Sequence, residues 1–340
     1  MSSFTLGLAI LGGLLLAALV AYNAWTSRRN APRQPEAPPA ADLPAPLDRA
    51  DPVFDVGLDT PLPQAERKPN LDALIDVLTP IAVEDAVSGD AALAAMPPTR
   101  RAGSKPFAIE GWNEAAQQWE TPHAGQRYAA FQAGVQLANR TGALNEIEFS
   151  EFVMKVQEFA DAVNGAPDFP DMIDEVARAR ELDQFASGHD AQLGFMLRAR
   201  NAAWSPGYVQ QNAARLGFMP GAIAGRMVLP ANSPGAPPLL GLSFDTQAAL
   251  AEDPAQSALR ELTLSLDVPQ VHRGEQPFAR MCEAATALAA SMDGVVTDDN
   301  GEAIRPEGMD VIASDLEQLY DTLDARDLGA GSPLARRLFS

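Results

Sequence analysis

The most regular alternation of apolar and polar residues lies at 262–268, where leucine or valine occupies every second position. This period of two predicts a β-strand with one buried face. Residues 276–294 then carry apolar side chains at helical spacing, and Gly294 at the end of this range is a stop signal. A second amphipathic helix is expected from Pro306 to Leu323, with its proline in the first turn. The predicted order is strand, helix, strand, helix.

An earlier part of the chain shows a similar order. Residues 151–159 alternate like a strand, 169–186 have helical spacing, 192–199 read as a strand, and 205–217 read as a helix capped by Ser205. Two further strands are expected before each copy, at 105–111 and 126–138 and at 222–230 and 237–245. The pattern predicts an internal repeat of about 110 residues. The predicted class is α+β, with antiparallel or mixed sheets and helices on one face.

The N-terminal region differs in character from the rest. Residues 4–22 contain no charged side chain and are long enough to cross a lipid bilayer as one helix. Trp25 and then Arg28, Arg29 and Arg33 follow this stretch. The positive-inside rule then predicts a periplasmic N-terminus and a cytoplasmic bulk. A cleaved signal peptide would need a basic leading segment, which the sequence lacks. A single-pass transmembrane anchor at 1–29 is therefore expected.

Residues 30–70 contain ten prolines and few apolar side chains, which predicts a Pro-rich disordered linker. Within it, residues 51–61 (DPVFDVGLDTP) place Val53, Phe54, Val56 and Leu58 between acidic residues. This segment is either a short docking motif or a less polar part of the linker.

Composition and motifs argue against several classes of function. The net charge is −20, and clustered Lys and Arg are confined to the run near residue 28, so nucleic acid is not an expected partner. The single Cys282 cannot form an internal disulfide. Residues 294–312 resemble a calcium loop, but Val296 replaces the first carboxylate, so Asp298, Asp299 and Asn300 are predicted to be turn residues only. The histidines lack ligand spacing, and no phosphate loop or nucleophile elbow occurs. We expect no metal, no cofactor and no enzymatic activity.

The order of features resembles the family of the bacterial cell-division protein ZipA. The runs LSLDVP, PFARMCEAATALA, DGVVTDDNG and RPEGM, followed by a final helix, carry the resemblance. It covers residues 191–325, predicted as the ZipA-like C-terminal domain, and residues 71–190 form a first α+β unit with a weaker likeness, notably in FVMKVQ. Residues 326–340 are expected to be a C-terminal tail.

The resemblance implies a function. The family tethers FtsZ polymers to the inner membrane at the division septum, and an apolar groove on its open sheet face receives the FtsZ C-terminal tail peptide. Carried onto this chain, the partner-binding positions are Leu193, Ile223, Leu239, Gly241 and Ser265. Ser265 stands where the family has an aromatic residue, and Asp245 where it has an apolar one, which puts the strength of peptide binding in doubt.

The sequence leaves two alternatives open. In the first unit, the comparable face is expected to carry Gln136, Arg140, Val153 and Lys155, whose positive charges suit an acidic tail. The second alternative is a structural envelope protein whose sheet domains associate as a homo-oligomer.

Overall fold

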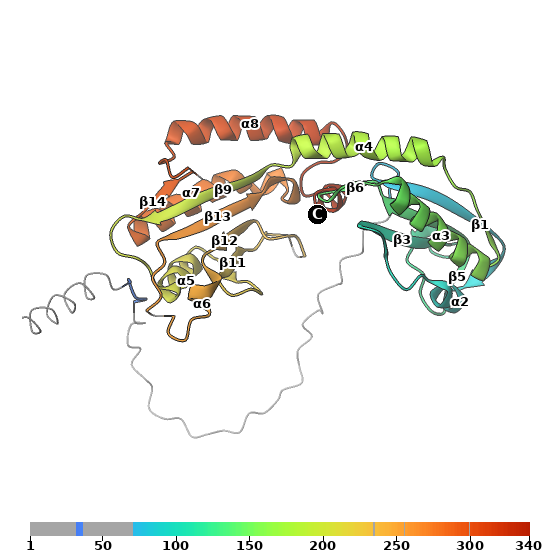
Figure 1. Cartoon of the computed structure of the whole chain (residues 1–340), viewed down its shortest axis with the longest axis horizontal. Helices are drawn as coiled ribbons and strands as arrows, with labels where there is room; N and C mark the ends of the chain where they lie inside the picture. The colour runs from blue at the N-terminus through green and yellow to red at the C-terminus, as the bar shows by residue number, and fades with distance from the viewer. Residues whose placement is uncertain (1–31, 37–70, 234, 255, 299) are drawn as a thin grey trace, which may run out of the picture. The chain divides into compact units, whose positions relative to one another are not determined.

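The computed structural model describes residues 32–36, 71–233, 235–254, 256–298 and 300–340 (Figure 1). They form two compact units. The first unit contains the described residues within 65–191 together with 268–273 and 317–340. The second contains those within 1–64, 192–267 and 274–316. The predicted span at 4–22 and the linker segment 51–61 lie outside the described residues. In the described ranges, no helix has the length and hydropathy required to cross a membrane.

The sheet of the first unit has the strand order β2-β3-β5-β1-β8, and β4 pairs with β3. All of these pairings are antiparallel. The strands are β1 (Asp76–Ser88), β2 (Arg101–Ala102), β3 (Lys105–Asn113), β4 (Gln118–Glu120), β5 (Arg127–Gln136) and β8 (Gly165–Pro167), with a separate hairpin of β6 (Ala138–Asn139) and β7 (Gly142–Ala143). Alternate residues of β3 and β5, among them Ile109 and Val135, are buried on one face.

Helix α3 covers this buried face. The first unit also contains α2 (Gly89–Ala95), α3 (Glu146–Ala162) and α4 (Met172–His189). The Phe152 ring lies 5.8 Å from that of Phe107 on β3, and the Phe159 ring lies 5.2 Å from that of Phe131 on β5. The prediction of a strand at 151–159 is therefore wrong. Asn145 forms a capping box that starts the helix at Glu146, and the buried phenylalanines follow a helical period.

The C-terminal residues complete the first unit. Helix α9 (Pro333–Leu338) follows Ser332, whose side chain caps it. Arg337 Nη1 donates to Asp76 Oδ2 at 2.9 Å, and Gln136 Nε2 donates to the Arg337 carbonyl at 2.8 Å. Phe339 is only 1% exposed. Residues 326–340, predicted as a tail, thus include part of the first unit's core.

The second unit has the strand order β10-β11-β12-β13-β9-β14, again with every pairing antiparallel. Its strands are β9 (Gln192–Ala199), β10 (Met219–Pro220), β11 (Arg226–Leu229), β12 (Leu240–Ser243), β13 (Glu261–Asp267) and β14 (Gly294–Thr297). The strand predicted at 262–268 is confirmed as β13, and Leu262, Leu264 and Leu266 are buried.

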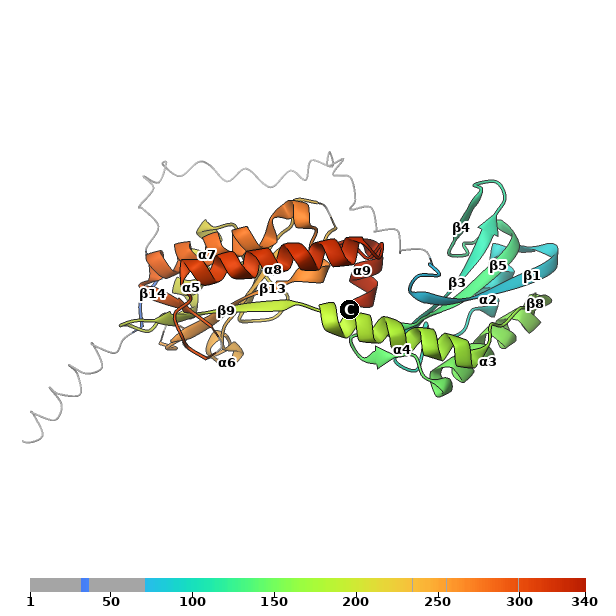
Figure 2. The ribbon, with the colours of Figure 1, turned by 90° about the horizontal axis from the view of Figure 1, so that it is seen from above.

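The helices of the second unit are α5 (Pro206–Arg215), α6 (Thr246–Ala249) and α7 (Pro277–Met292), with the beginning of α8 (Pro306–Asp324). Helix α7 lies along the sheet over β13 and β9, where the Phe278 and Phe195 rings stand 6.1 Å apart (Figure 2). The Ser205 side chain accepts a hydrogen bond from the Tyr208 N–H, as its predicted capping role requires. The α+β class with antiparallel sheets is confirmed.

Both sheets place their strands in a comparable order. β1 lies between β5 and β8, and β9 lies between β13 and β14. A long helix joins the last two strands in each case, α3 in the first unit and α7 in the second. β9 and α5, which the predicted repeat placed at the end of its first copy, open the second unit instead.

Candidate functional site

The face of the second sheet that α7 does not cover carries a transverse row of residues. In antiparallel sheets, directly paired residues point to the same side. The pairing register therefore aligns Met219, Val228, Gly241, Ser265 and Gly194 across neighbouring strands. We call this set the open-face row. Met219 is 51% exposed and Ser265 is also exposed, so the row is accessible to solvent.

The centre of the open-face row is shallow because its side chains are small. A Cβ atom built on Gly241 would stand 2.6 Å from Ser265 Oγ, so a larger residue at 241 would displace the serine. Met196 follows Gly194 by two residues on β9, so it lies on the same side of the sheet, opposite Thr263. Met219 and Val228 in the row, and Met196 beside it, offer apolar contact. The row contains no aromatic side chain. Arg226 lies on the same side next to the row, opposite Ser243, so a peptide bound across the row would pass beside a positive charge.

The structure brings Gly241 and Ser265 together on this face, but not the other predicted positions. Leu193 pairs with Leu266, which is 1% exposed, so Leu193 lies on the covered face and its predicted placement is wrong. Leu239 is also buried, at 1% exposure. Ile223 is 51% exposed, but it lies in the turn before β11 rather than on a strand. Its turn contains Gly225 at φ +77°.

The alternative residues of the first unit do not form one sheet face. Gln136 is 1% exposed and its amide is bonded to the carbonyls of Ala138 and Arg337. Arg140 forms an ion pair with Asp190 at 2.6 Å. Val153 and Lys155 lie on α3, where Lys155 pairs with Glu151 at 2.6 Å. The predicted common surface is wrong because residues 151–159 are helical.

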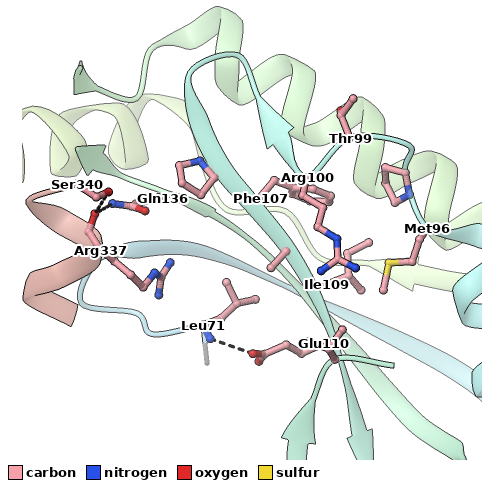
Figure 3. A pocket seen from close by; sticks show the side chains of 14 residues that line it. Leu71, Met96, Thr99, Arg100, Phe107, Ile109, Glu110, Gln136, Arg337 and Ser340 are labelled. Carbon is pink, nitrogen blue, oxygen red and sulfur yellow. Dashed lines mark hydrogen bonds between the residues drawn. The ribbon is translucent and has the colours of Figure 1, made fainter. Parts of the chain in front are cut away.

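The first unit does contain a cavity beside β3, which sequence reasoning missed (Figure 3). Its volume is about 320 Å³. Its lining comprises Leu71, Met96, Pro97, Thr99, Arg100, Pro106, Phe107, Ala108, Ile109, Glu110, Thr121, Gln136, Arg337 and Ser340. Arg100 and Arg337 reach towards it from opposite sides. We call it the β3 cavity.

Some charged residues at or near the β3 cavity have hydrogen-bond or ion-pair partners, and Arg100 has no ion-pair partner among the described residues. Burial raises the pKa of the Asp76 carboxyl, and the hydrogen bonds and charge of Arg337 oppose this rise. Glu110 accepts the Leu71 N–H at 3.1 Å and the Gln132 amide at 2.8 Å. Arg100 is exposed, and no ion-pair partner for it occurs within the part of the chain that the structure describes.

Several other polar side chains have structural partners. Asp298 accepts the backbone N–H groups of Asn300 at 2.9 Å and Glu302 at 2.8 Å, as a turn residue does, while Asp299 lies outside the described residues. Lys105 Nζ donates to Asn139 Oδ1 at 2.9 Å, and burial lowers its pKa. Burial raises the pKa of the Cys282 thiol, which disfavours the nucleophilic thiolate. No cluster suited to a metal ion occurs among the described residues.

One comparison with known families gives a match. Residues 250–315 match the model described as ZipA, C-terminal FtsZ-binding domain. This stretch includes β13, α7, β14 and the start of α8, and the resemblance inferred from the sequence is confirmed there. A comparison with curated proteins finds no match.

Proposed function

We propose that this protein is a cell-division adaptor that binds the C-terminal tail of FtsZ and tethers FtsZ polymers to the inner membrane. The match of residues 250–315 to the ZipA C-terminal FtsZ-binding domain carries the proposal. The role requires binding rather than catalysis. It agrees with the raised pKa of the Cys282 thiol and with the turn role of Asp298.

The open-face row is the proposed peptide site. It lies on the second unit, and β13 within the matched region supplies Ser265. Gly241 and Ser265 remain candidate contacts, and Val228 and Met196 replace Leu193, which faces the covered side, and the buried Leu239. Burial of apolar surface contributes roughly 25 cal/mol per Å² before ordering costs, so a row this shallow favours weak binding. Weak single contacts suit a polymer that presents many tails at once.

Membrane attachment is the second part of the proposal. The uncharged residues 4–22, followed by Arg28 and Arg29, support a single span with a periplasmic N-terminus. Residues 32–36, which the predicted linker included, are bound to the second unit, where Arg33 pairs with Asp293 at 2.9 Å and Glu36 pairs with Arg215 at 2.7 Å. The residues between the proposed span and Arg33 then act as the spacer to the bilayer, and residues 37–70 connect the second unit to the first.

A duplication accounts for the comparable strand orders of the two units. We propose that β1, α3 and β8 correspond to β9, α7 and β14, with α4 corresponding to α8. The first unit then descends from the same ancestral domain as the second, although its open face carries different residues.

The direct test is capture of purified FtsZ by the full chain in detergent micelles, with intact FtsZ and FtsZ lacking its tail. The proposal expects capture that depends on the tail. Val228→Glu should weaken capture at least tenfold because the new charge must be desolvated against the peptide. Ile223→Glu is the matched control, since Ile223 is exposed but lies off the row. Self-association of the chain without FtsZ capture would instead support the structural envelope protein.

A further inference from the structure

The β3 cavity lies on the side of the first sheet that α3 does not cover. The Phe152 ring of α3 packs on Phe107, so Phe107 points to the covered side. Side chains alternate along a strand, so Ala108 points to the opposite side. Ala108 pairs with Gly134 of β5, and a Cβ atom built on Gly134 would stand 2.6 Å from a methyl group of Leu71. Ala108 and Leu71, which both line the cavity, therefore lie on the open face of this sheet.

Much of the cavity wall is apolar. Leu71, Met96, Pro97, Pro106 and Ala108 belong to the lining, and Ala108 is exposed. The volume of about 320 Å³ lies at the lower end of the range of ligand pockets. A cavity of this size accommodates one large apolar side chain together with the adjoining backbone. Binding of such a group would remove apolar surface from water.

The charged groups at the cavity are engaged, with one exception. Arg337 donates to the buried Asp76 at 2.9 Å. Glu110 accepts the Leu71 N–H at 3.1 Å and a second hydrogen bond from Gln132 at 2.8 Å. Arg100 is exposed and has no ion-pair partner in the described ranges. A planar guanidinium binds a carboxylate through two parallel hydrogen bonds, so a carboxylate is the group that Arg100 suits best.

The backbone that carries Arg100 is held in place before any ligand arrives. The Arg100 carbonyl accepts the Phe107 N–H of β3 at 3.0 Å. The preceding Thr99 hydroxyl accepts a hydrogen bond from Lys155 Nζ of α3 at 2.9 Å. Binding therefore needs to order the Arg100 side chain but not the loop beneath it, which lowers the entropic cost.

The partner proposed for this protein supplies both kinds of group. A C-terminal tail ends in a carboxylate, and capture of that chain end is a recurring mode of peptide recognition. We propose that the β3 cavity is a second binding site for the FtsZ tail, which inserts an apolar side chain and pairs its terminal carboxylate with Arg100. This inference rests on the proposed function and extends it from one site to two. A chain with two sites can be held by two tails of one polymer, and the affinities then reinforce each other.

Methionine methyl groups report the two sites separately. Met96 lines the β3 cavity, and Met219 belongs to the open-face row. The full chain in detergent micelles, labelled with ¹³C in its methionine methyl groups, is titrated with a synthetic peptide of the FtsZ C-terminal tail and followed by NMR. Both signals should shift, each with its own dissociation constant.

Two changes test the ion pair, one in the protein and one in the peptide. Arg100→Gln should weaken binding at Met96 at least tenfold and leave binding at Met219 unchanged. A peptide whose terminal carboxylate is replaced by a carboxamide should do the same. Arg101→Gln is the matched control and should change neither, because Arg101 donates to the Ser104 carbonyl at 3.0 Å and does not line the cavity. An unchanged urea midpoint reports that the first unit of each variant stays folded.

The outcomes separate this inference from the proposed function. A shift of Met219 without a shift of Met96 would overturn the second site and leave the proposed function standing. No shift of either signal would overturn both. Equal weakening at Met96 by Arg100→Gln and Arg101→Gln would show a general effect of charge and refute the ion pair. Weakening by Arg100→Gln but not by the carboxamide would overturn the assignment of the chain end.

Discussion

Replacing Arg337 with glutamine should destabilise the first unit more than replacing its partner Asp76 with asparagine. Asp76 is fully buried, with 0% side-chain exposure, while the Arg337 side chain is 17% exposed. Removing the arginine leaves a buried carboxylate without its countercharge. Removing the carboxylate leaves an arginine that can still turn towards water.

The structure sets the size of each effect. Breaking a buried ion pair by removing one partner typically costs about 3–5 kcal/mol. Asp76 Oδ2 also accepts the Asp72 N–H at 2.8 Å, so the carboxylate in Arg337→Gln keeps one donor. We therefore expect Arg337→Gln to lower the free energy of unfolding by about 3 kcal/mol at neutral pH. Asp76→Asn should cost about 1–2 kcal/mol, in the range for one lost charged hydrogen bond. The double variant should cost less than the sum, by at least about 1 kcal/mol.

The loss in Arg337→Gln should depend on pH with a defined sign. Burial raises the pKa of Asp76, and Arg337 lowers it, so the substitution raises this pKa further in the folded state. A carboxyl whose folded pKa is raised stabilises the fold most when protonated, below its ordinary pKa of about 4. That contribution is lost as the pH rises through the folded pKa. The deficit should thus be smallest in acid and complete at neutral pH.

Urea unfolding of the full chain in micelles, followed by pulsed hydrogen exchange on β1 and β5 peptides, separates the first unit from the second. The midpoint shift at unchanged slope gives the change in free energy. A cost of less than about 1 kcal/mol at pH 7, or a deficit that grows in acid, would refute the role assigned to the buried pair.

Three further outcomes are expected. Ser265→Phe should tighten binding of an FtsZ tail peptide about fivefold in a fluorescence titration, because about 40 Å² of added apolar contact contributes about 1 kcal/mol; weaker binding would exclude the open-face row. Calorimetric titration with calcium should give only the heat of dilution, since Asp298 is engaged by Asn300 and Glu302, whereas a micromolar site would contradict this. A phosphatase reporter inserted within residues 62–70 should be inactive, and an active one would reverse the proposed membrane orientation.

The sequence predicted the second unit better than the first. The patterns that determine the second unit's elements, residue alternation and helix capping, act between neighbours in the chain. β13 has one apolar and one polar face, and α5 begins with Ser205 followed by proline, so period and capping agree with the fold. Residues 151–159 gave two conflicting signals. Phe152 and Val156 fit both an alternating and a helical pattern, and the capping box at Asn145 decides for the helix.

The candidate site was harder to predict because the sequence does not show which residues of β9 face the covered side of the sheet and which face the open side. β9 carries apolar residues on both faces, such as Leu193 on the covered side and Met196 on the open side, so hydrophobicity alone does not orient it. Only pairing with the alternating β13 resolves the parity. The β3 cavity depends on Leu71, Arg100 and Arg337, which are far apart in sequence, and no local pattern indicates that they meet.

The closure of the first unit by α9 has a consequence for synthesis. The ribosome makes β1 about 250 residues before Arg337, so Asp76 leaves the exit tunnel long before its partner exists. The second unit, which ends at Leu316, has its strands available sooner than the first unit has its complete core. The first unit, whose β1 precedes every strand of the second unit, is thus completed after the second. A nascent chain that has not yet made α9 would carry a first-unit sheet in which Asp76 lacks its Arg337 partner.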